Sequence, residues 1–122
     1  MKIEIPVMAR PKKNSQQIYI NPKTKRPFIT QSKNYKEFEK VCGEYLKDYQ
    51  LHINFYINLK CTFYVSDRRK RDIVNLLNAM QDILVKYGVI EDDNYNIVAS
   101  VDGSRIIYEK GREETIIEIE KI

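Results

Sequence analysis

Two apolar periods follow one another near residue 70 and restrict this chain to a sheet with a helix packed against it. In NFYINLKCTFYVS (54–66) every second residue from Phe55 to Val65 is apolar, which is the period of a half-buried strand. From about residue 71 to 87 apolar residues recur every three or four positions, which is the period of an amphipathic helix. Gly88 follows, and glycine commonly stands just beyond a helix C-terminus.

The remaining segments predict another helix and several short strands. Alternation predicts strands at 2–8 and 114–122, while QIYI (17–20) and PFIT (27–30) flank the turn residues NPKTKR and predict a small ribbon. NIVASV and IIYEK read as strands joined through the turn-like DGSR (102–105). A helix is expected from about 33 to 48, with Ser32 as its N-cap and an apolar face of Tyr35, Phe38, Val41, Cys42 and Tyr45. The order predicts one α+β domain over residues 1–122, with a mixed sheet and two helices on one face.

Charge is distributed unevenly along the chain. The net charge is +4, and the segment from Arg10 to Lys36 holds eight basic residues and no acid. The basic balance indicates an anionic partner. Two cysteines and one histidine are too few for a zinc site, so we expect reduced cysteines. No apolar run approaches the length of a membrane span and the N-terminus lacks a signal peptide, so a soluble cytoplasmic protein with no membrane contact is expected.

Carboxylates stand at both ends of the helix predicted at 71–87. The stretch RKRDIVNLLNAMQDILVKYGVIEDDN (69–94) places Asp72 at the first turn and Asp92 and Asp93 shortly after Gly88. If the chain returns so that Asp93 approaches Asp72, these carboxylates repel one another unless a proton or a divalent cation lies between them. Oxygen ligands and a phosphate substrate suit Mg²⁺. The alternative reading makes Asp72 a helix cap, the other acids turn residues and the basic run a solvated loop.

The same stretch resembles the signature of the RusA family of Holliday junction resolvases. Asp72 and Asn75 match the opening Asp-x-Asp-Asn of that signature, Asp82 matches its middle Asp, and Gly88 with Asp92 and Asp93 matches its closing turn. PKKNS, around Lys13 and Asn14, is similar to the family's N-terminal segment. The chain departs from the family at two places: the second Asp is Val74, and the lysine one turn into the helix is Asn78.

The resemblance implies a homodimeric, Mg²⁺-dependent endonuclease, with Mn²⁺ as a substitute, that cuts branched DNA in a bacterial or phage-infected cell. The implied catalytic residues are Asp72, Asp93, Lys70 and Arg71, where Lys70 or Arg71 replaces the missing lysine. The implied metal ligands are Asp72, Asp93, Asp92 and Asp102, with Asp102 as the preferred replacement for the acid missing at Val74 and a turn residue as its alternative role. The implied DNA contacts are Lys12, Lys13, Asn14, Lys25, Arg26, Arg68, Arg69 and Asn75.

Two further expectations concern geometry and alternatives. If Asp72 and Asp93 share a metal site, their carboxylates should lie within about 8 Å of each other. Tyr19 and Phe28 of the ribbon are candidates to stack on unpaired bases, unless the ribbon packs on its own sheet. The other functions kept open are a non-catalytic protein that binds branched DNA and a flap or single-strand nuclease on the same scaffold. The cleavage sequence and the preference between junction and flap stay undetermined.

Overall fold

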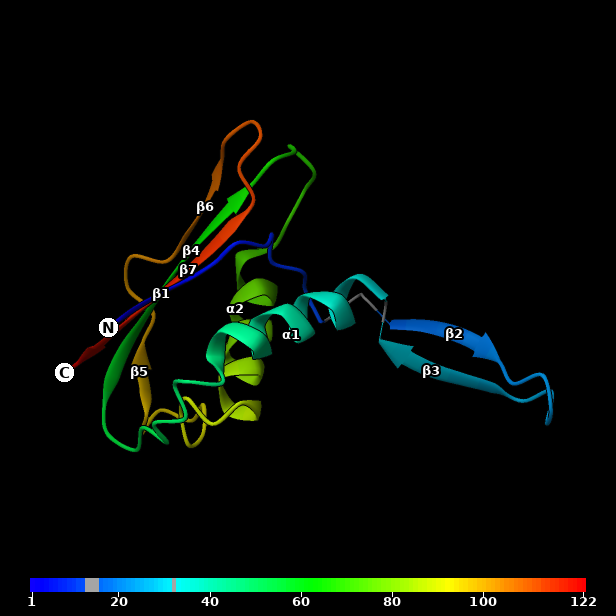
Figure 1. Cartoon of the computed structure of the whole chain (residues 1–122), viewed down its shortest axis with the longest axis horizontal. Coiled ribbons are helices and arrows are strands. Elements are labelled where there is room, and N and C mark those ends of the chain that lie inside the picture. The colour runs from blue at the N-terminus through cyan, green and yellow to red at the C-terminus, as the bar shows by residue number, and fades with distance from the viewer. Residues whose placement is uncertain (13–15, 32) are drawn as a thin grey trace.

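A computed structural model gives the structure of this chain and describes residues 1–12, 16–31 and 33–122. A five-stranded sheet carries both helices on one face, and a separate two-stranded sheet extends away from this body (Figure 1). The helices are α1 (Lys33–Leu46) and α2 (Ile73–Lys86). The larger sheet contains β1 (Lys2–Ile5), β4 (Ile57–Val65), β5 (Val98–Ser100), β6 (Arg105–Tyr108) and β7 (Glu114–Lys121). The predicted α+β fold with a mixed sheet is confirmed, whereas Ser32, the predicted N-cap of α1, lies outside the described residues.

Strand β4 lies at the centre of the sheet and carries its mixed pairing. It pairs antiparallel with β7, which pairs antiparallel with β1. Alternation places Leu59, Cys61 and Phe63 of β4 under the helices, fully buried, while Asn58 and Lys60 point to the opposite face. The strand that the strict alternation of residues 55–65 predicted is confirmed over Ile57–Val65, and its place at the centre of the sheet comes from the fold.

Strands β5 and β6 do not form the hairpin that the turn DGSR predicted. Both run parallel to β4, with Val98 opposite Ile57 and Arg105 opposite Thr62. They therefore lie one after the other along the same edge of β4. The turn between them is held by Asn58, whose side chain accepts from the Asp102 N–H at 2.8 Å and donates to the Asp102 carbonyl at 3.1 Å. That anchor turns the chain without folding β6 back on β5.

Helix α1 packs against the sheet and α2 through a stripe that differs from the predicted one at its end. Tyr35, Phe38, Cys42 and Leu46 are buried, whereas Tyr45, which the sequence placed on this face, is 43% exposed. The stripe follows steps of three, four and four residues, so Leu46 continues it and Tyr45 falls outside. Gly43 is also buried on this helix. A Cβ at Gly43 would lie 2.5 Å from the ring of Tyr87, which follows α2.

We expect Gly43→Ala to lower the free energy of unfolding by about 1–3 kcal/mol, because the added methyl collides with the Tyr87 ring. The Tyr87→Ala background is the control. There the collision is gone and alanine is the better helix former, so the same substitution should stabilise α1 by roughly 0.5–1 kcal/mol. Urea denaturation of the four proteins measures both effects. An equal cost in both backgrounds would contradict this explanation of Gly43.

Helix α2 ends as its sequence predicts. Gly88 has a positive φ of 75°, and its N–H donates to the Val85 carbonyl at 3.1 Å. The Val89 N–H donates to the Leu84 carbonyl at 2.9 Å, so the last carbonyls of the helix are satisfied. The chain then passes beside the segment that leads into β4, where the Glu91 N–H donates to the Ile53 carbonyl. This turn fixes where Asp92 and Asp93 lie relative to α2.

The predicted basic ribbon is present as strands β2 (Gln16–Ile20) and β3 (Pro27–Gln31), which pair antiparallel. Their turn, residues 21–26, is organised by Asn21, whose side chain accepts from the N–H groups of Lys23 and Thr24. Lys25 has a positive φ of 57° in this turn. The hairpin projects from the body, and Lys25 and Arg26 are exposed in the turn at its far end (Figure 1).

Both cysteines are free and buried, as expected for a protein that needs no disulfide. Burial raises the pKa of each thiol, Cys42 and Cys61, to about 12, so neither is a reactive thiolate near neutral pH. Within the described part of the chain, neither helix has the length and apolar character needed to cross a membrane.

Candidate functional site

Asp72 is the N-cap of α2 and still exposes its carboxylate. One oxygen, Oδ1, accepts from the Val74 N–H at 2.9 Å, which satisfies one of the free donors of the first turn. The helix N-terminus favours this negative charge. Val74, two residues later, is 57% exposed. The capping role and a role as a ligand are compatible, because a carboxylate that accepts one hydrogen bond retains further lone pairs.

The basic loop before α2 contains two kinds of arginine. Arg68, Arg69 and Lys70 are exposed, and the Arg68 guanidinium lies 4.6 Å from the centre of the Tyr108 ring. The Arg71 side chain is only 13% exposed. It donates to Asp67 Oδ2 at 3.0 Å and to the backbone carbonyl of Arg69 at 3.1 Å. Arg71, predicted from the resemblance to serve catalysis, is therefore positioned to hold the loop, while the other three present their charge to solvent.

The ion pair between Arg71 and Asp67 should make stability depend on pH. The hydrogen bond from Arg71, together with the Arg69 N–H, lowers the pKa of Asp67 from 3.8 to about 2. A lowered pKa in the folded state stabilises the fold above the unfolded pKa, and the contribution is lost as pH falls through the folded pKa. Asp67→Asn should therefore destabilise the protein at neutral pH, and its difference from the wild type should shrink steadily as pH falls towards about 2. Urea titrations along this pH range test it; a constant difference would contradict it.

The other end of α2 carries an acidic pocket, which we define by its eight lining residues. It is an open cavity of about 440 Å³ between α1, α2 and the segment that follows α2. Its lining consists of four carboxylates, two lysines, a tyrosine and a valine: Glu39, Asp82, Asp92, Asp93, Lys12, Lys86, Tyr35 and Val85. Four acids, none of them adjacent to Asp72 in sequence, thus face one cavity.

Asp92 and Asp93 differ in their electrostatic state although they are neighbours. Asp92 accepts from the Asp93 N–H at 2.7 Å and from the Asn94 side chain at 3.1 Å, and these bonds lower the pKa of Asp92. The pKa of Asp93 is raised, first by burial and then by the hydrogen bond and the charge of Asp92, with Asp82 adding to the repulsion. A cation in the acidic pocket would relieve this repulsion at Asp93.

Two lysines counter part of this negative charge. Lys86 of α2 forms an ion pair and hydrogen bond with Glu39 of α1. Lys12 lies with its Nζ 3.6 Å from Asp82 Oδ2. Burial and the hydrogen bond with Glu39 raise the pKa of Tyr35 well above its usual value, so its hydroxyl stays protonated. The acidic pocket thus presents four carboxylates against two ammonium groups.

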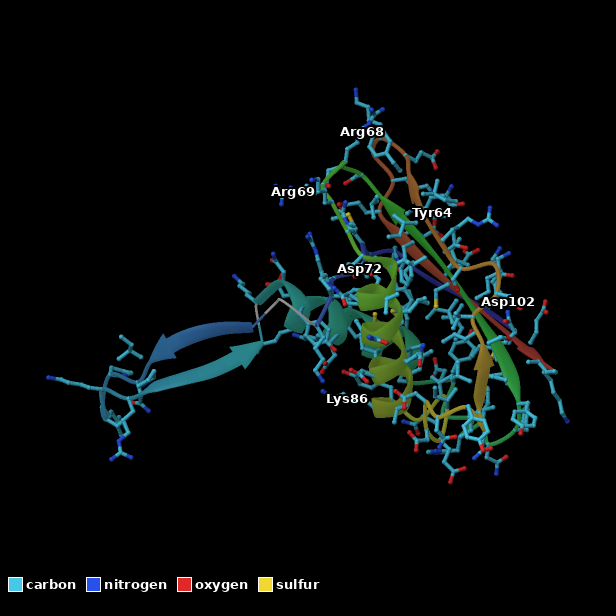
Figure 2. All side chains as sticks on the ribbon, turned by 180° about the vertical axis from the view of Figure 1, so that it is seen from behind. Tyr64, Arg68, Arg69, Asp72, Lys86 and Asp102 are labelled. Atoms are coloured by element: carbon cyan, nitrogen blue, oxygen red, sulfur yellow. The ribbon has the colours of Figure 1, made fainter. Side chains whose placement is uncertain are left out.

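Asp72 and Asp93 do not come together within one chain. Asp72 precedes the first residue of α2 and the acidic pocket lies at its last turn, as the positions of Asp72 and Lys86 show (Figure 2). A helix of 14 residues is about 20 Å long. The expected separation of about 8 Å is therefore wrong for a single chain, because a straight helix separates the two ends.

Asp102 also lies apart from both ends of α2. It occupies the turn after β5 and is exposed, and it lines a second cavity together with Asn58, Lys60 and Glu118. Because side chains alternate along β4, Asn58 and Lys60 point away from the buried face, so this cavity lies on the uncovered face of the sheet. Figure 2 shows Asp102 apart from Asp72 and Lys86 at the two ends of α2. The turn role explains Asp102, and its proposed place beside Asp72 and Asp93 is corrected, because the sheet separates them.

The remaining predicted DNA contacts are distributed over several segments. Lys12 lines the acidic pocket, Asn75 is half-buried on the first turns of α2, and Lys25 and Arg26 are exposed in the hairpin turn. Lys13 and Asn14 lie outside the described residues, as do the side chains of Tyr19 and Phe28. Their predicted roles stay predictions.

Sequence reasoning did not include Asp82, Glu39 and Lys86 among the site residues. Asp82 and Lys86 lie on the same helical stripe as Asp72, which is a signal in the sequence, whereas Glu39 comes from the other helix and only the tertiary fold brings it near. Within the described part of one chain, no three acidic, histidine or cysteine side chains are grouped so as to hold a metal ion. Carboxylate oxygens are ligands that Mg²⁺ prefers, but the described residues of one chain do not group enough of them for an ion.

Comparison with known proteins adds one relative. No family model matches this chain. The crossover junction endodeoxyribonuclease RusA of Aquifex aeolicus (strain VF5) is 40% identical to it over 67 residues, which are 55% of this chain and 51% of that protein. The chain thus spans about half the length of the curated relative that it matches. This similarity agrees with the resemblance of the motif around α2 to the RusA signature.

Proposed function

We propose that this chain is a structure-selective endodeoxyribonuclease that resolves four-way DNA junctions by phosphodiester hydrolysis with Mg²⁺, for which Mn²⁺ substitutes. The observation that carries the proposal is the presence of exposed carboxylates at both ends of α2 with exposed cations on adjoining segments. The name of the Aquifex aeolicus relative describes such an activity for that protein. Branched DNA in the cytoplasm of a bacterial or phage-infected cell would be the substrate.

We further propose that the working form is a homodimer whose sites combine residues from both chains. Asp72 and Asp93 are too far apart to act together in one chain. In a pair with two-fold symmetry and antiparallel α2 helices, Asp72 of one chain would approach the acidic pocket of the other. The same symmetry would generate two equivalent sites, and a four-way junction needs two symmetric nicks. The dimer therefore accounts for the separated acids and for the symmetry of the substrate.

Each group of residues then has a defined role. The ligands would be Asp72 from one chain and Asp93 with Asp92 from the other, and the ion they hold would acidify a bound water and stabilise the departing oxygen. The exposed cations Arg68, Arg69 and Lys70 would neutralise phosphates beside Asp72. Arg71 would keep that loop in place through Asp67.

A second candidate function is non-catalytic binding of branched DNA. It is favoured by the incomplete ligand set of the described part of one chain and by Val74 in the place of a family acid. In that case Asp72 would act only as a cap, and Asp92 and Asp93 as turn residues. A nuclease that prefers flaps or single strands on the same scaffold is a variant of the first proposal.

Incubation of the protein with Mg²⁺ and three labelled substrates separates these functions. A synthetic four-way junction, a linear duplex and a flap of equal length should each be tested, with Asp93→Asn as the inactive control. We expect paired symmetric nicks in the junction and little cutting of the duplex. Junction binding without cutting by the wild type would support the non-catalytic function, and faster cutting of the flap would support the flap nuclease.

The hairpin should supply affinity that does not depend on DNA shape. We expect the variant with Lys23, Lys25 and Arg26 replaced by Gln to bind junction and duplex more weakly. Its log Kd should depend less on log salt, by about 0.9 for each phosphate that the variant no longer neutralises. Lys47→Gln, just after α1, is the control: it shows how much the loss of one positive charge elsewhere on the surface changes the salt dependence of Kd. Filter binding between low and moderate salt measures the slopes. Unchanged slopes in the hairpin variant would show that these residues do not touch DNA.

A further inference from the structure

Lys12 connects the basic hairpin to the acidic pocket. It is the last described residue before the hairpin, and the next described residue, Gln16, begins β2. Its ammonium lies 3.6 Å from the Asp82 carboxylate of α2. The pocket that both residues line also contains Asp92 and Asp93. Lys12 therefore lies between two parts of the molecule: the hairpin, which is expected to contact DNA phosphates, and the acids that are proposed to hold the metal ion.

The pair between Lys12 and Asp82 is of a kind that exchanges readily. Its Nζ–Oδ2 distance is longer than that of a hydrogen bond, and the two side chains are 46% and 45% exposed. Such exposed pairs contribute little to stability, so a competing anion can displace the carboxylate. The other lysine of the pocket, Lys86, is closely paired with Glu39 and comes from α2 itself. Lys12 is the better placed of the two to follow DNA that lies along the hairpin.

DNA that reaches the acidic pocket meets a strong repulsion. Four carboxylates line this cavity, and only two lysines line it with them. A phosphate in the same place adds another negative charge, which is unfavourable unless a cation accompanies it. The cation must also be able to leave its carboxylate, because a fully paired ammonium offers the phosphate little net attraction.

We propose that Lys12 exchanges Asp82 for a DNA phosphate at the rim of the acidic pocket, and so positions the phosphodiester backbone over the carboxylates. This role rests on the proposed nuclease function and adds to it a residue that selects where the backbone enters. In the free protein Lys12 neutralises Asp82. In the complex Lys12 contacts the phosphate, and Asp82 is released to face Asp93.

A double-mutant cycle on DNA affinity tests the exchange without cleavage. Junction binding is measured in EDTA for the wild type, Lys12→Gln, Asp82→Asn and the double variant. Asp82→Asn should tighten binding in both backgrounds because a repelling charge is removed. The gain should be about threefold larger when Lys12 is present, because only then does the substitution also remove the cost of breaking the pair. A control cycle that combines Lys47→Gln with Asp82→Asn should be additive.

Turnover gives an independent second readout. At saturating junction and Mg²⁺, Lys12→Gln should cut about tenfold more slowly than the wild type, and Lys12→Arg should retain most of the rate, because it keeps a cation at the rim. Lys47→Gln should cut at the wild-type rate. Circular dichroism melting of each variant checks that the fold is intact.

The outcomes separate the two proposals. The proposed exchange would be overturned if the effects of Lys12→Gln and Asp82→Asn on junction affinity were additive. It would also be overturned if Lys12→Gln cut saturating junction at the wild-type rate. A wild-type protein that binds the junction but never cuts it would instead overturn the nuclease function. In that event the affinity cycle still tests whether Lys12 exchanges its ion pair with Asp82 for an ion pair with the DNA phosphate.

Discussion

A mixture of Asp72→Asn and Asp93→Asn chains is expected to regain the junction cleavage that each variant alone has lost. If each site takes Asp72 from one chain and Asp93 from the other, each homodimer has two defective sites. The mixed dimer has one site with both substitutions and one intact site. Random pairing makes half of the dimers mixed, so about a quarter of wild-type sites should be active. Each variant alone should lose activity on the order of 100-fold.

The chosen substitutions keep the fold intact. Asparagine caps a helix about as well as aspartate, so Asp72→Asn retains the N-cap of α2. Asp93 is exposed in the segment after α2. Co-expression with two different affinity tags allows the mixed dimer to be purified, and single-turnover cleavage measures its activity. No recovery in the purified mixed dimer would contradict a site shared between chains, since sites within one chain would all remain defective.

Val74→Asp should increase Mg²⁺-dependent cleavage by about tenfold, because it adds a carboxylate two residues from Asp72 at a position that is already exposed. An acid in the first turn of α2 is also favourable for the helix, so stability should not limit the effect. Asparagine has nearly the shape of aspartate but carries no charge, so Val74→Asn is the matched control. Equal rates for the two variants would show that no further carboxylate is needed there.

Asp102→Asn tests whether Asp102 supplies the carboxylate that is missing at Val74. The structure places Asp102 in the turn held by Asn58, on the face of the sheet away from the helices. We therefore expect it to cut at the wild-type rate. A loss of Mg²⁺-dependent cutting by Asp102→Asn, with DNA binding retained, would restore the ligand role that the sequence suggested.

The elements with a strong local period were predictable from the sequence. Residues 57–65 alternate strictly and form β4, and residues 73–86 follow the helical period and form α2. Gly88 ends that helix in the expected conformation. Pairing between distant strands was not predictable in the same way. The turn at 102–105 has the composition of a hairpin turn, yet both flanking strands pair with β4, because Asn58 anchors the turn.

In the candidate site, too, some features were predictable from the sequence and others depend on the tertiary fold. The motif identified Asp72, Asp92 and Asp93, but the length of α2 sets them at two ends, which a pattern of spacing does not reveal. Arg71 appeared equivalent to the other cations of its loop in the sequence. Only the fold turns it inward, where Asp67 and backbone carbonyls surround it. Glu39 and Lys12 reach the acidic pocket from separate segments, so their contribution depends on tertiary packing.

The most direct test of the proposed activity is cleavage of a supercoiled plasmid that extrudes a cruciform. A symmetric dimer that resolves four-way junctions should convert this plasmid to linear DNA in Mg²⁺, with paired nicks across the cruciform, and should leave a plasmid without the cruciform intact. The mixed dimer of Asp72→Asn and Asp93→Asn, with one intact site, should yield nicked circles instead. Intact cruciform plasmid after incubation of the wild-type protein with Mg²⁺, or equal cutting of both plasmids, would contradict the proposed activity.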